Sequence, residues 1–406
     1  MDVVLILKVA FLSIFLFWVF YNMPAFFFGL KLGVKIRKRG DMDPDPPSDC
    51  QPKVSIIVPV KNEEKVVERL LKALVNLTYP EKEVIIVEDG STDNTSQKCR
   101  RYAEDYPSLI KFYHKNPSHG KPSAINYAAR KATGEIIAVY DADTVIEPDA
   151  LQQIVPHFTD PKVGAVQGEV YTLNPDENLI TKLSVLNDFL IHVQQLGKDK
   201  LGLFVTCLGT HMYVRRSVLE ELNYWDPQAL AEDLELSVRL TKKGYKVKYV
   251  PVKAGVEAPA KLKTFIRQRL RWFRGYIQAA GKHLNLLGHL NREAFDAQLT
   301  LLLPMMLTLS LLGYAVGIYG AFNPASGSQI EQTIGAALLL LSLCSPAAMI
   351  AANPKSAAYA PLLYLNWILM ASISTLAYLH AMLRKPLEWK KTEKTGNLAW
   401  KKEGSF

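Results

Sequence analysis

The sequence predicts an α/β domain, with a parallel sheet covered by helices on both faces, joined to helices that cross a membrane. Three short apolar runs, Val54–Val58, Val84–Glu88 and Ile136–Tyr140, alternate with helical patterns. Strand, helix and strand in repetition are typical of a parallel sheet. Uncharged runs lie on both sides of this region, and about 20 helical residues suffice to cross the hydrocarbon core. The 406 residues allow two or three units of roughly 150 residues.

The amino-terminal run Val9–Leu30 is uncharged and longer than the apolar core of a signal peptide. It predicts a transmembrane helix in residues 1–30, which we expect Pro24 to kink near its end. A basic, proline-rich linker is predicted over residues 31–52. Because positive charge follows the helix, the next region is expected on the cytoplasmic side. The basic residues are Lys31, Lys35, Arg37, Lys38 and Arg39.

Residues 53–256 are expected to form the α/β domain, and residues 257–298 amphipathic helices. Apolar residues recur on one helical face over 179–193 and again over 262–277. In the second segment, basic residues alternate with the apolar ones along the chain, which is typical of a helix lying in a membrane surface. Packing of either helix on the core of the domain is the alternative, and both remain open.

Three more uncharged runs, Leu299–Ala321, Ile334–Ala352 and Ala357–Leu379, predict three transmembrane helices within residues 299–383. A basic tail, residues 384–406, follows. Four spans that begin outside would leave this tail outside, whereas its lysines and arginines favour the inside. Either one segment is re-entrant or the tail breaks the rule.

Charge and cysteine content exclude several classes of protein. The net charge of +9 suits a negatively charged partner, but the basic clusters flank the predicted spans, so we expect no nucleic acid. The four cysteines form no C-x-x-C pair, which argues against a disulfide framework or a structural zinc site. Gly120-Lys121 lacks the spacing of a P-loop, which argues against a nucleoside triphosphatase.

Acidic residues follow each predicted strand. Glu63 comes after the first, Glu88 and Asp89 after the second, and Asp141 and Asp143 after the third. Carboxylates at strand ends are costly to bury unless they meet a cation or hydrogen-bond donors. Two carboxylates one residue apart can both reach a divalent cation that also binds substrate phosphate oxygens. We favour this role over a solvated loop.

Five motifs in this order resemble those of the family 2 glycosyltransferases. This inverting GT-A class includes cellulose, chitin, hyaluronan and poly-N-acetylglucosamine synthases. The resemblance runs from about Val54 to Trp272 and implies a Rossmann-like GT-A domain for nucleotide-diphosphate sugars. The motifs are Val87-Glu88-Asp89-Gly90-Ser91-Thr92-Asp93, Gly120-Lys121-Pro122-Ser123-Ala124-Ile125-Asn126, Asp141-Ala142-Asp143, Ala231-Glu232-Asp233 and Gln268-Arg269-Leu270-Arg271-Trp272.

The resemblance implies that acidic residues and one lysine bind the donor. Asp89, with Glu63 and Glu88, would hold the nucleotide, and Lys121 would lie near the donor. Asp141 and Asp143 would hold Mg²⁺ or Mn²⁺ on the diphosphate. Two departures weaken the expectation of uridine: Glu88 replaces a common aspartate, and Lys61 stands where many relatives have a tyrosine.

The resemblance also implies a catalytic base and a second set of substrate contacts. Asp233 would accept the proton of the acceptor hydroxyl, although an aspartate just before a helix is also a common N-cap. Gln268, Arg271 and Trp272 form the Q-x-x-R-W motif, in which Arg271 would contact the diphosphate and Trp272 the acceptor. A guanidinium is a rigid fork for phosphate. Solvated or membrane-facing positions on a basic helix are the alternatives for these three residues.

The predicted function is extension of a polysaccharide from a nucleotide sugar, expected to be a UDP-sugar, at the cytoplasmic face of the plasma membrane. Transfer of one sugar to a lipid acceptor is the alternative. An inactive relative acting as a membrane scaffold is a third hypothesis, which the intact acidic set disfavours. His211 either lines the acceptor path or is structural.

Overall fold

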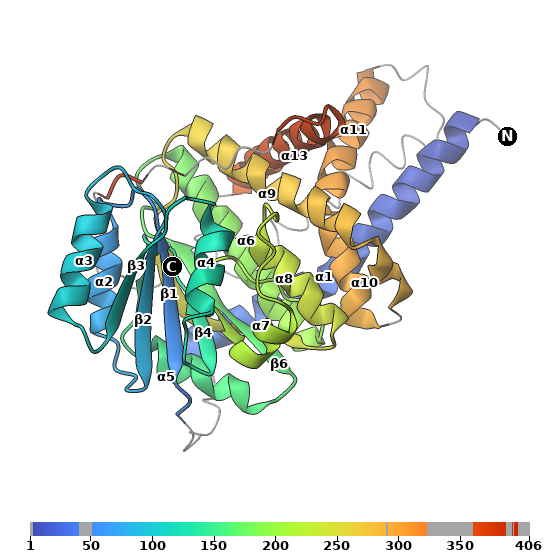
Figure 1. Cartoon of the computed structure of the whole chain (residues 1–406). Helices are drawn as coiled ribbons and strands as arrows, with labels where there is room; N and C mark the ends of the chain where they lie inside the picture. Colours follow the sequence, from blue (N-terminus) through green and yellow to red (C-terminus); the bar gives the residue numbers. More distant parts are fainter. Residues whose placement is uncertain are drawn as a thin grey trace. The chain divides into compact units, whose positions relative to one another are not determined.

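The computed structural model describes residues 3–39, 51–289, 291–322, 360–386, 392 and 394–396 (Figure 1). The chain divides into two compact units. The sheet unit comprises Asp43–His192, Phe204–Gln268 and Glu388–Phe406, and the helical unit comprises Met1–Met42, Val193–Leu203 and Arg269–Leu387.

One eight-stranded sheet forms the sheet unit, in the order β3-β2-β1-β4-β7-β6-β8-β5. The three predicted strands are confirmed as β1, β2 and β4. The strands are β1 Val54–Val60, β2 Lys82–Glu88, β3 Ile110–His114, β4 Ile136–Val139, β5 Val145–Ile146, β6 Val163–Thr172, β7 Met212–Arg215 and β8 Lys246–Val256.

The sheet is mixed, so the expectation of a wholly parallel sheet is wrong. Strands β3, β2, β1 and β4 are parallel, as predicted, but β7 runs antiparallel to both β4 and β6, and β5 runs antiparallel to β8. Strands β5 and β7 span only two and four residues, too few to show a periodic pattern.

Short helices cover the sheet and complete its core. The helical pattern after β1 is confirmed as α2, whose Val67, Leu70, Leu71 and Leu74 are buried. Helix α4 packs across β1 and β2 (Figure 1). The helices are α2 Val67–Val75, α3 Thr95–Asp105, α4 Lys121–Ala129, α5 Ala150–Ile154, α7 Arg216–Glu221 and α8 Glu232–Lys242, with the 3₁₀ helix η1 Val155–Thr159.

Two longer helices, α6 Leu179–Leu201 and α9 Leu262–Lys282, each contribute residues to both units. They correspond to the two predicted amphipathic segments. In α9, Phe265 and Phe273 are buried as the pattern predicts, whereas Leu262 is 47% exposed. The apolar face of α9 is therefore only partly covered by protein.

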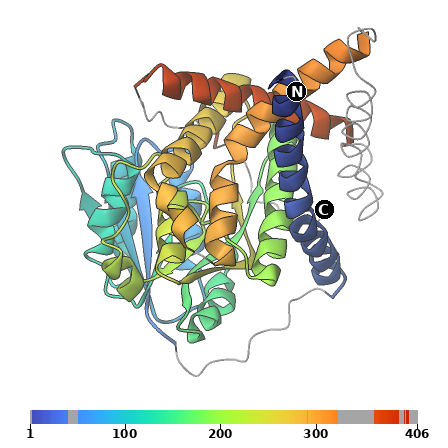
Figure 2. The same cartoon turned by 90° about the vertical axis from the view of Figure 1, so that its right-hand side faces the viewer.

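The helical unit contains α1 Val3–Arg39, η2 Leu284–Gly288, α10 Arg292–Leu301, α11 Leu303–Phe322 and α13 Ala360–Met382. Helix α1 continues through Pro24 to Arg39. Residues 31–39 are thus helical, and the prediction that they begin a linker is wrong. Figure 2 shows α13, in red, crossing α11, in orange.

In the part of the chain that the structure describes, two helices are long and apolar enough to cross a membrane, within Leu16–Ile36 and Pro361–Met382. Helices α10 and α11 form a third span only if they count together, and they bend by 52° at their break. The predicted span 299–321 therefore falls on two helices. The predicted span 334–352 lies outside the described residues.

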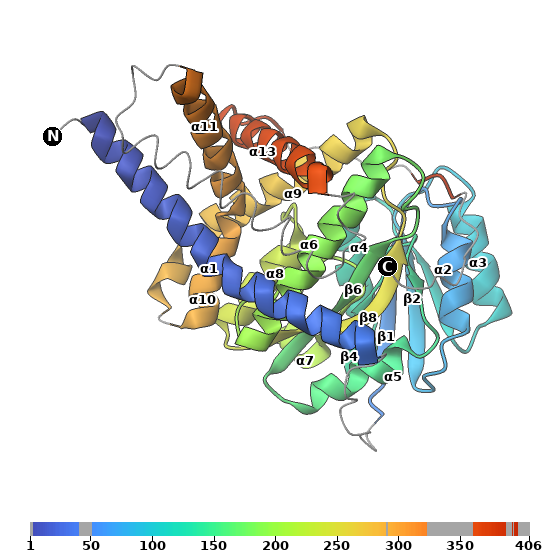
Figure 3. The same cartoon turned by 180° about the vertical axis from the view of Figure 1, so that it is seen from behind.

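Helices α1 and α6 cross with their backbones in contact (Figure 3). A Cβ atom on Gly197 would lie 1.7 Å from the carbonyl oxygen of Ala25, and one on Gly29 would lie 1.8 Å from that of Val193. Real atoms cannot approach so closely, so both positions require glycine. Small residues at helix crossings are typical of helices that pack in membranes.

Helix α6 is also tied to α10 by a buried ion pair. The Nζ atom of Lys198 lies 3.0 Å from Oδ2 of Asp296 and donates to Oγ1 of Thr300 at 2.6 Å. Both charged side chains are almost fully buried. A buried pair is costly to break because the remaining charge keeps no partner.

We expect Gly197→Ala to destabilise the helical unit by about 1–3 kcal/mol, because the added methyl group forces α1 away from α6. The thermal unfolding midpoint in detergent measures this loss. Gly281→Ala in α9 is the matched control, since its added methyl group would have no atom within 4 Å. Equal midpoints for the two variants would contradict the close crossing.

At the amino-terminal ends of the strands, Glu83 is a buried carboxylate that joins several chain segments. It accepts from Ser55 Oγ at 2.6 Å, from Thr133 N at 2.8 Å and from Lys111 Nζ at 2.7 Å. Burial would raise the pKa of Glu83, but these donors outweigh it and lower the pKa to about 2. The charged form therefore stabilises the fold.

Acid should remove this stabilisation. The ordinary pKa of 4.5 applies to the unfolded chain, so the contribution of Glu83 is complete above that value. It is lost as pH falls toward 2, and amounts to about 3 kcal/mol at neutral pH. We expect Glu83→Gln to be less stable than the unmodified chain at pH 7. Between pH 5 and pH 3, the variant should lose less stability than the unmodified chain does. Unfolding midpoints across this range, with exposed Glu104→Gln as control, test the prediction.

Candidate active site

The carboxyl ends of β1, β2 and β4 lie at one edge of the sheet, because β1 pairs in parallel with both neighbours. The loops after β1 and β2 are bonded to each other. The backbone N–H of Asn62 donates to Ser91 Oγ at 2.9 Å, and that of Thr92 donates to Asn62 Oδ1 at 2.7 Å. The backbone N–H of Glu63 donates to Thr95 Oγ1 at 2.6 Å. The structure thus places Glu63 beside the β2 loop.

Asp89, at the end of β2, organises the loop that precedes α4. Its Oδ2 accepts from Ser118 Oγ at 2.7 Å and from the backbone N–H of Gly120 at 2.9 Å. Its Oδ1 lies 3.3 Å from Lys115 Nζ. Lys61, which replaces a tyrosine common among relatives, donates to Ser118 at 2.8 Å and so joins the same network.

Glu88 is fully buried, and its carboxylate is bonded to the protein itself. It accepts from the backbone N–H of Ser91 and contacts Nδ1 of His114. This geometry gives Glu88 a role in holding the β2 loop. Its predicted contact with the donor stays a prediction.

Lys121 links two acidic segments of the site to the Gly209 loop. It is the first residue of α4, and its Nζ lies 2.8 Å from Asp141 Oδ1 and 3.4 Å from Glu232 Oε1. It also donates to the carbonyl oxygen of Gly209 at 2.8 Å. Burial alone would lower the pKa of Lys121, but the charges of Asp141, Glu232 and Asp233 outweigh burial and raise it. The ammonium group is therefore charged at neutral pH.

Asp143 is buried, whereas Asp141 is partly exposed. Oδ2 of Asp143 accepts from the backbone N–H of Glu257 at 3.0 Å, and its carbonyl oxygen accepts from Arg69 at 3.2 Å. Lys394, from the carboxyl-terminal segment, also pairs with this carboxylate. Burial would raise the pKa of Asp143, but Lys394 and the Glu257 N–H outweigh it and lower the pKa.

Asp233 lies in the first turn of α8, whose N-cap is Ala231, so the N-cap interpretation of Asp233 is wrong. A helix amino terminus favours a negative charge at this position. A Cβ atom on Gly209 would lie 2.9 Å from Asp233 Oδ2, so the carboxylate packs against the Gly209 backbone. The structure thereby brings Asp233 to the loop that Lys121 also contacts.

The loop before β7 occupies the centre of this arrangement. Thr210 Oγ1 accepts from the backbone N–H of Asp141 at 3.0 Å. Gln167, which is fully buried, donates to the carbonyl oxygens of Thr210 at 3.1 Å and His211 at 3.2 Å and accepts from the backbone N–H of Leu208 at 2.7 Å. Sequence reasoning missed Gln167 because a lone glutamine in a strand carries no motif.

His211 is structural, the second of its two predicted roles. It is fully buried, and its Nε2 lies 2.8 Å from the carbonyl oxygen of Val252. Its Nδ1 is bonded to the hydroxyl group of Tyr213 at 3.0 Å. Burial lowers the pKa of His211 to about 4, so the ring is neutral at physiological pH.

The chemistry of Asp141 and Asp143 suits a divalent cation. Both offer hard carboxylate oxygens from one short loop, and Asp141 is exposed enough to meet a ligand. Among the described residues, no three acidic, histidine or cysteine side chains form a preformed metal cluster. The residues therefore fit a cation whose coordination is completed by water and substrate phosphate, as is usual for Mg²⁺.

The Q-x-x-R-W motif crosses the boundary between the units. Gln268 is the last residue of its segment in the sheet unit, and Arg271 and Trp272 belong to the helical unit. The guanidinium of Arg269 lies 4.2 Å from the centroid of the Trp272 ring, which fixes that ring by a cation–π contact. The substrate contacts of Gln268, Arg271 and Trp272 stay predictions.

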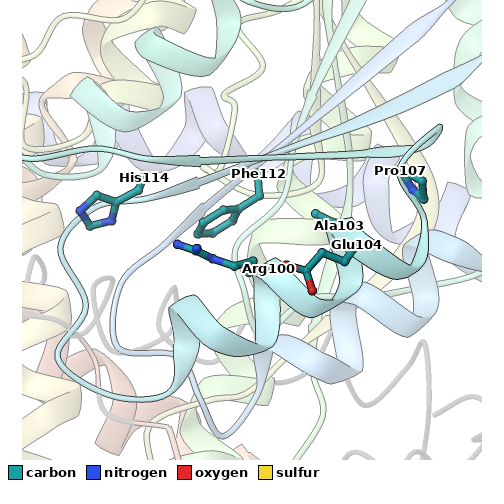
Figure 4. Close-up of a pocket in the computed structure, with 6 residues that line it drawn as sticks. All are labelled: Arg100, Ala103, Glu104, Pro107, Phe112 and His114. Carbon is teal, nitrogen blue, oxygen red and sulfur yellow. The ribbon is translucent and has the colours of Figure 1, made fainter.

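An open groove lies elsewhere on the sheet unit, between α3 and β3 (Figure 4). Arg100 lies over the Phe112 ring, 5.7 Å from its centroid, with His114 at one end. None of the predicted site residues lines this groove. Its His114 contacts Glu88, so one end of the groove adjoins the acidic edge.

Residues 55–222 match the family model described as Glycosyl transferase family 2. The chain contains a family 2 glycosyltransferase domain. The resemblance inferred from the five motifs is thereby confirmed. The match covers β1 to the end of α7, which includes the loops of Asp89, Lys121 and Asp141.

Two curated relatives align with about half of the length of this chain. The probable glycosyltransferase YdaM of Bacillus subtilis (strain 168) is 37% identical over 231 residues, 55% of this chain and 55% of that protein. The poly-beta-1,6-N-acetyl-D-glucosamine synthase of Staphylococcus epidermidis is 30% identical over 224 residues, 55% of this chain and 54% of that protein. The chain thus matches about half the length of these relatives as well.

A solved structure is similar over most of the chain. The mannosyltransferase PcManGT from Pyrobaculum calidifontis, in complex with GDP-Man and Mn²⁺, has a TM-score of 0.62 and 25% sequence identity. The similarity covers 91% of this chain and 99% of that one. The predicted GT-A fold is confirmed.

We expect Gly209→Ala to lower sugar transfer by about 10- to 100-fold, because small displacements of a catalytic group have effects of this size. The new methyl group would displace Asp233, and the φ of +76° at Gly209 is strained for alanine. Gly244→Ala is the control, since it has a φ of +83° and no atom within 4 Å of the added methyl. Equal turnover in the two variants would show that the Gly209 backbone does not position Asp233.

Proposed function

We propose that the protein transfers a sugar from a nucleotide-diphosphate sugar to an acceptor hydroxyl, with inversion at the anomeric carbon. The observation that carries this proposal is the meeting of Asp141, Lys121 and Asp233 around the Gly209 loop. Carboxylates, a fixed cation and a candidate base thus share one edge of a GT-A sheet. Binding of nucleotide sugar by PcManGT, a structural relative over most of the chain, supports the donor class.

Asp233 is the proposed general base. As the acceptor oxygen attacks the anomeric carbon, its proton passes to the Asp233 carboxylate. The new glycosidic bond forms while the bond from the anomeric carbon to the diphosphate oxygen breaks, and the nucleoside diphosphate leaves with the electron pair. A single displacement of this kind inverts the anomeric centre.

Asp141 and Asp143 are the proposed ligands of Mg²⁺ or Mn²⁺. When bound, such an ion would stabilise the negative charge that develops on the leaving diphosphate. The Mn²⁺ in the related PcManGT complex supports a divalent ion at this edge. Asp89, with Glu63, is the proposed contact of the nucleotide, and Lys121 keeps Asp141 in place while adding positive charge near the diphosphate.

A growing polysaccharide is the acceptor that we propose first, and the similarity to a poly-N-acetylglucosamine synthase supports it. A lipid acceptor that receives one sugar is the second candidate. It is favoured by the small number of candidate spans among the described residues. In both cases we propose that the sheet unit lies on the cytoplasmic face.

We expect Asp233→Asn to lose about 100-fold or more of its turnover while keeping donor affinity, because an amide cannot accept the proton. Release of nucleoside diphosphate from UDP- and GDP-sugars, with Mg²⁺ or Mn²⁺, measures turnover, and calorimetry measures donor binding. Asp226→Asn, at a residue outside the proposed site, is the control. Unchanged turnover in Asp233→Asn would remove the assignment of the base.

Product size separates the two acceptors in the same assay. Long polymer from labelled donor would exclude the single-sugar transfer, and a glycolipid carrying one sugar would exclude the synthase.

A further inference from the structure

The carboxyl-terminal residues 394–396 lie on the sheet unit against the loop that holds Asp143. We propose that Glu257 is a positioning residue that anchors this segment, and that the anchored segment weakens cation binding at Asp143 through the charge of Lys394. The proposal rests on the proposed function, since it takes Asp143 as a cation ligand. It assigns new roles to a strand-end glutamate and to the tail.

Glu257 directs both its carboxylate and its backbone toward the segment and Asp143. Oε1 accepts from the Thr395 N–H and, at 2.8 Å, from the Thr395 hydroxyl, and Oε2 accepts from the Gly396 N–H at 3.2 Å. The backbone N–H of Glu257 donates to Asp143 Oδ2 at 3.0 Å. Its carbonyl oxygen accepts from Lys394 Nζ at 2.6 Å.

This carboxylate is bonded mainly to the segment. Glu257 is 2% exposed, and a buried carboxylate is costly without donors or a counter-charge. Arg69 lies 3.9 Å from Oε2, which is within range of an ion pair but too long for a hydrogen bond. The short, directed bonds to Glu257 come from Thr395 and Gly396, so docking of the segment supplies the hydrogen-bond donors of this carboxylate.

The docked conformation of the segment requires glycine at position 396. Its φ is +71°, in the left-handed region that favours glycine. A Cβ atom would lie 2.6 Å from the carbonyl oxygen of Lys65. Alanine at this position therefore clashes with backbone and cannot dock in the same way, although it alters no charged or hydrogen-bonding group.

Lys394 brings a positive charge directly onto the proposed cation ligand. Its Nζ lies 2.5 Å from Asp143 Oδ2, and its side chain is 14% exposed. A divalent ion on the same carboxylate would lie a few ångströms from this ammonium. Like charges at such a distance repel strongly where solvent screening is weak. The docked lysine and a bound cation therefore compete for Asp143.

The anchored segment also constrains how the helical unit crosses a membrane. Gln268 and residues 394–396 belong to the same unit, so they lie on one side of a bilayer. An even number of crossings must separate them, which disagrees with the three spans predicted within 299–383. The pair α10–α11, bent by 52°, is the described segment best suited to enter and leave on one side.

Amide exchange tests the anchor in the full-length protein in detergent. We expect Gly396→Ala and Glu257→Gln to speed deuterium exchange of the Thr395 and Gly396 amides by about 10-fold or more, as local opening becomes easier. Gly244→Ala, which shares a positive φ, should leave it unchanged. Unchanged exchange in Gly396→Ala would overturn the anchor.

Binding of Mn²⁺ alone, followed by electron paramagnetic resonance, tests the competition. We expect Lys394→Met and Gly396→Ala to bind Mn²⁺ about 3- to 10-fold more tightly than the unmodified chain, because a repelling charge is removed. Lys394→Arg keeps the charge and should match the unmodified chain. Equal or weaker binding by Lys394→Met would overturn the competition.

One further variant separates this inference from the proposed function. Asp143→Asn should bind Mn²⁺ more weakly, and if it does not, Asp143 is no cation ligand and the competition fails. Neither exchange nor Mn²⁺ binding depends on sugar transfer, so the inference can hold for a chain that turns over no donor. Reporter fusions test the even number of crossings. A green fluorescent protein fused after Phe406 should fluoresce in cells. If a fused alkaline phosphatase is active instead, the tail lies outside and the even number of crossings is contradicted.

Discussion

The burial of several carboxylates at one edge of the sheet is the constraint on which the rest of the sheet unit depends. A buried carboxylate is stable only where cations or N–H groups replace its water. Asp89 is held by the loop before α4, Asp141 by Lys121, and Asp143 by the backbone of Glu257. These partners come from distant parts of the chain. The acidic edge is therefore assembled only when the whole sheet has formed.

The Gly209 loop holds the charged groups of this edge in fixed positions. Lys121 donates to the Gly209 carbonyl, Asp233 packs against its α-carbon, and Thr210 accepts from the Asp141 backbone. Gln167 fixes the same loop from within the core. The candidate base Asp233 and the candidate cation ligand Asp141 are thereby held by one short segment whose backbone favours glycine at position 209.

The helical unit is held by close contacts between helix backbones and by a buried ion pair. Gly29 and Gly197 let α1 and α6 touch, and the Lys198–Asp296 pair joins α6 to α10 where water is excluded. Helices with long apolar stretches depend on such close contacts and buried polar bonds, because burial of apolar side chains distinguishes one packing from another only weakly in a membrane.

By itself, the sequence determined the α/β class and the strands that carry the candidate site, and it proposed most of the residues of that site. Apolar periodicity reveals strands β1, β2 and β4, and acidic motifs mark their ends, because both signals are local in the chain. The other five strands, the mixed sheet direction and the helical continuation of α1 to Arg39 were not predicted. Strands as short as β5 carry too little pattern, and strand direction depends on where the chain returns.

Only the tertiary structure decided which residues partner the predicted ones. Glu232 beside Lys121, Gln167 beneath the Gly209 loop, and Glu257 between Asp143 and the tail have no local signature. It also excluded the N-cap interpretation of Asp233, through the helix register, and showed that His211 is fully buried within the core. The physical reason is the same for each of these residues. The role of a buried polar side chain depends on the groups that bind it in place of water, and those groups are neighbours in space, not in sequence.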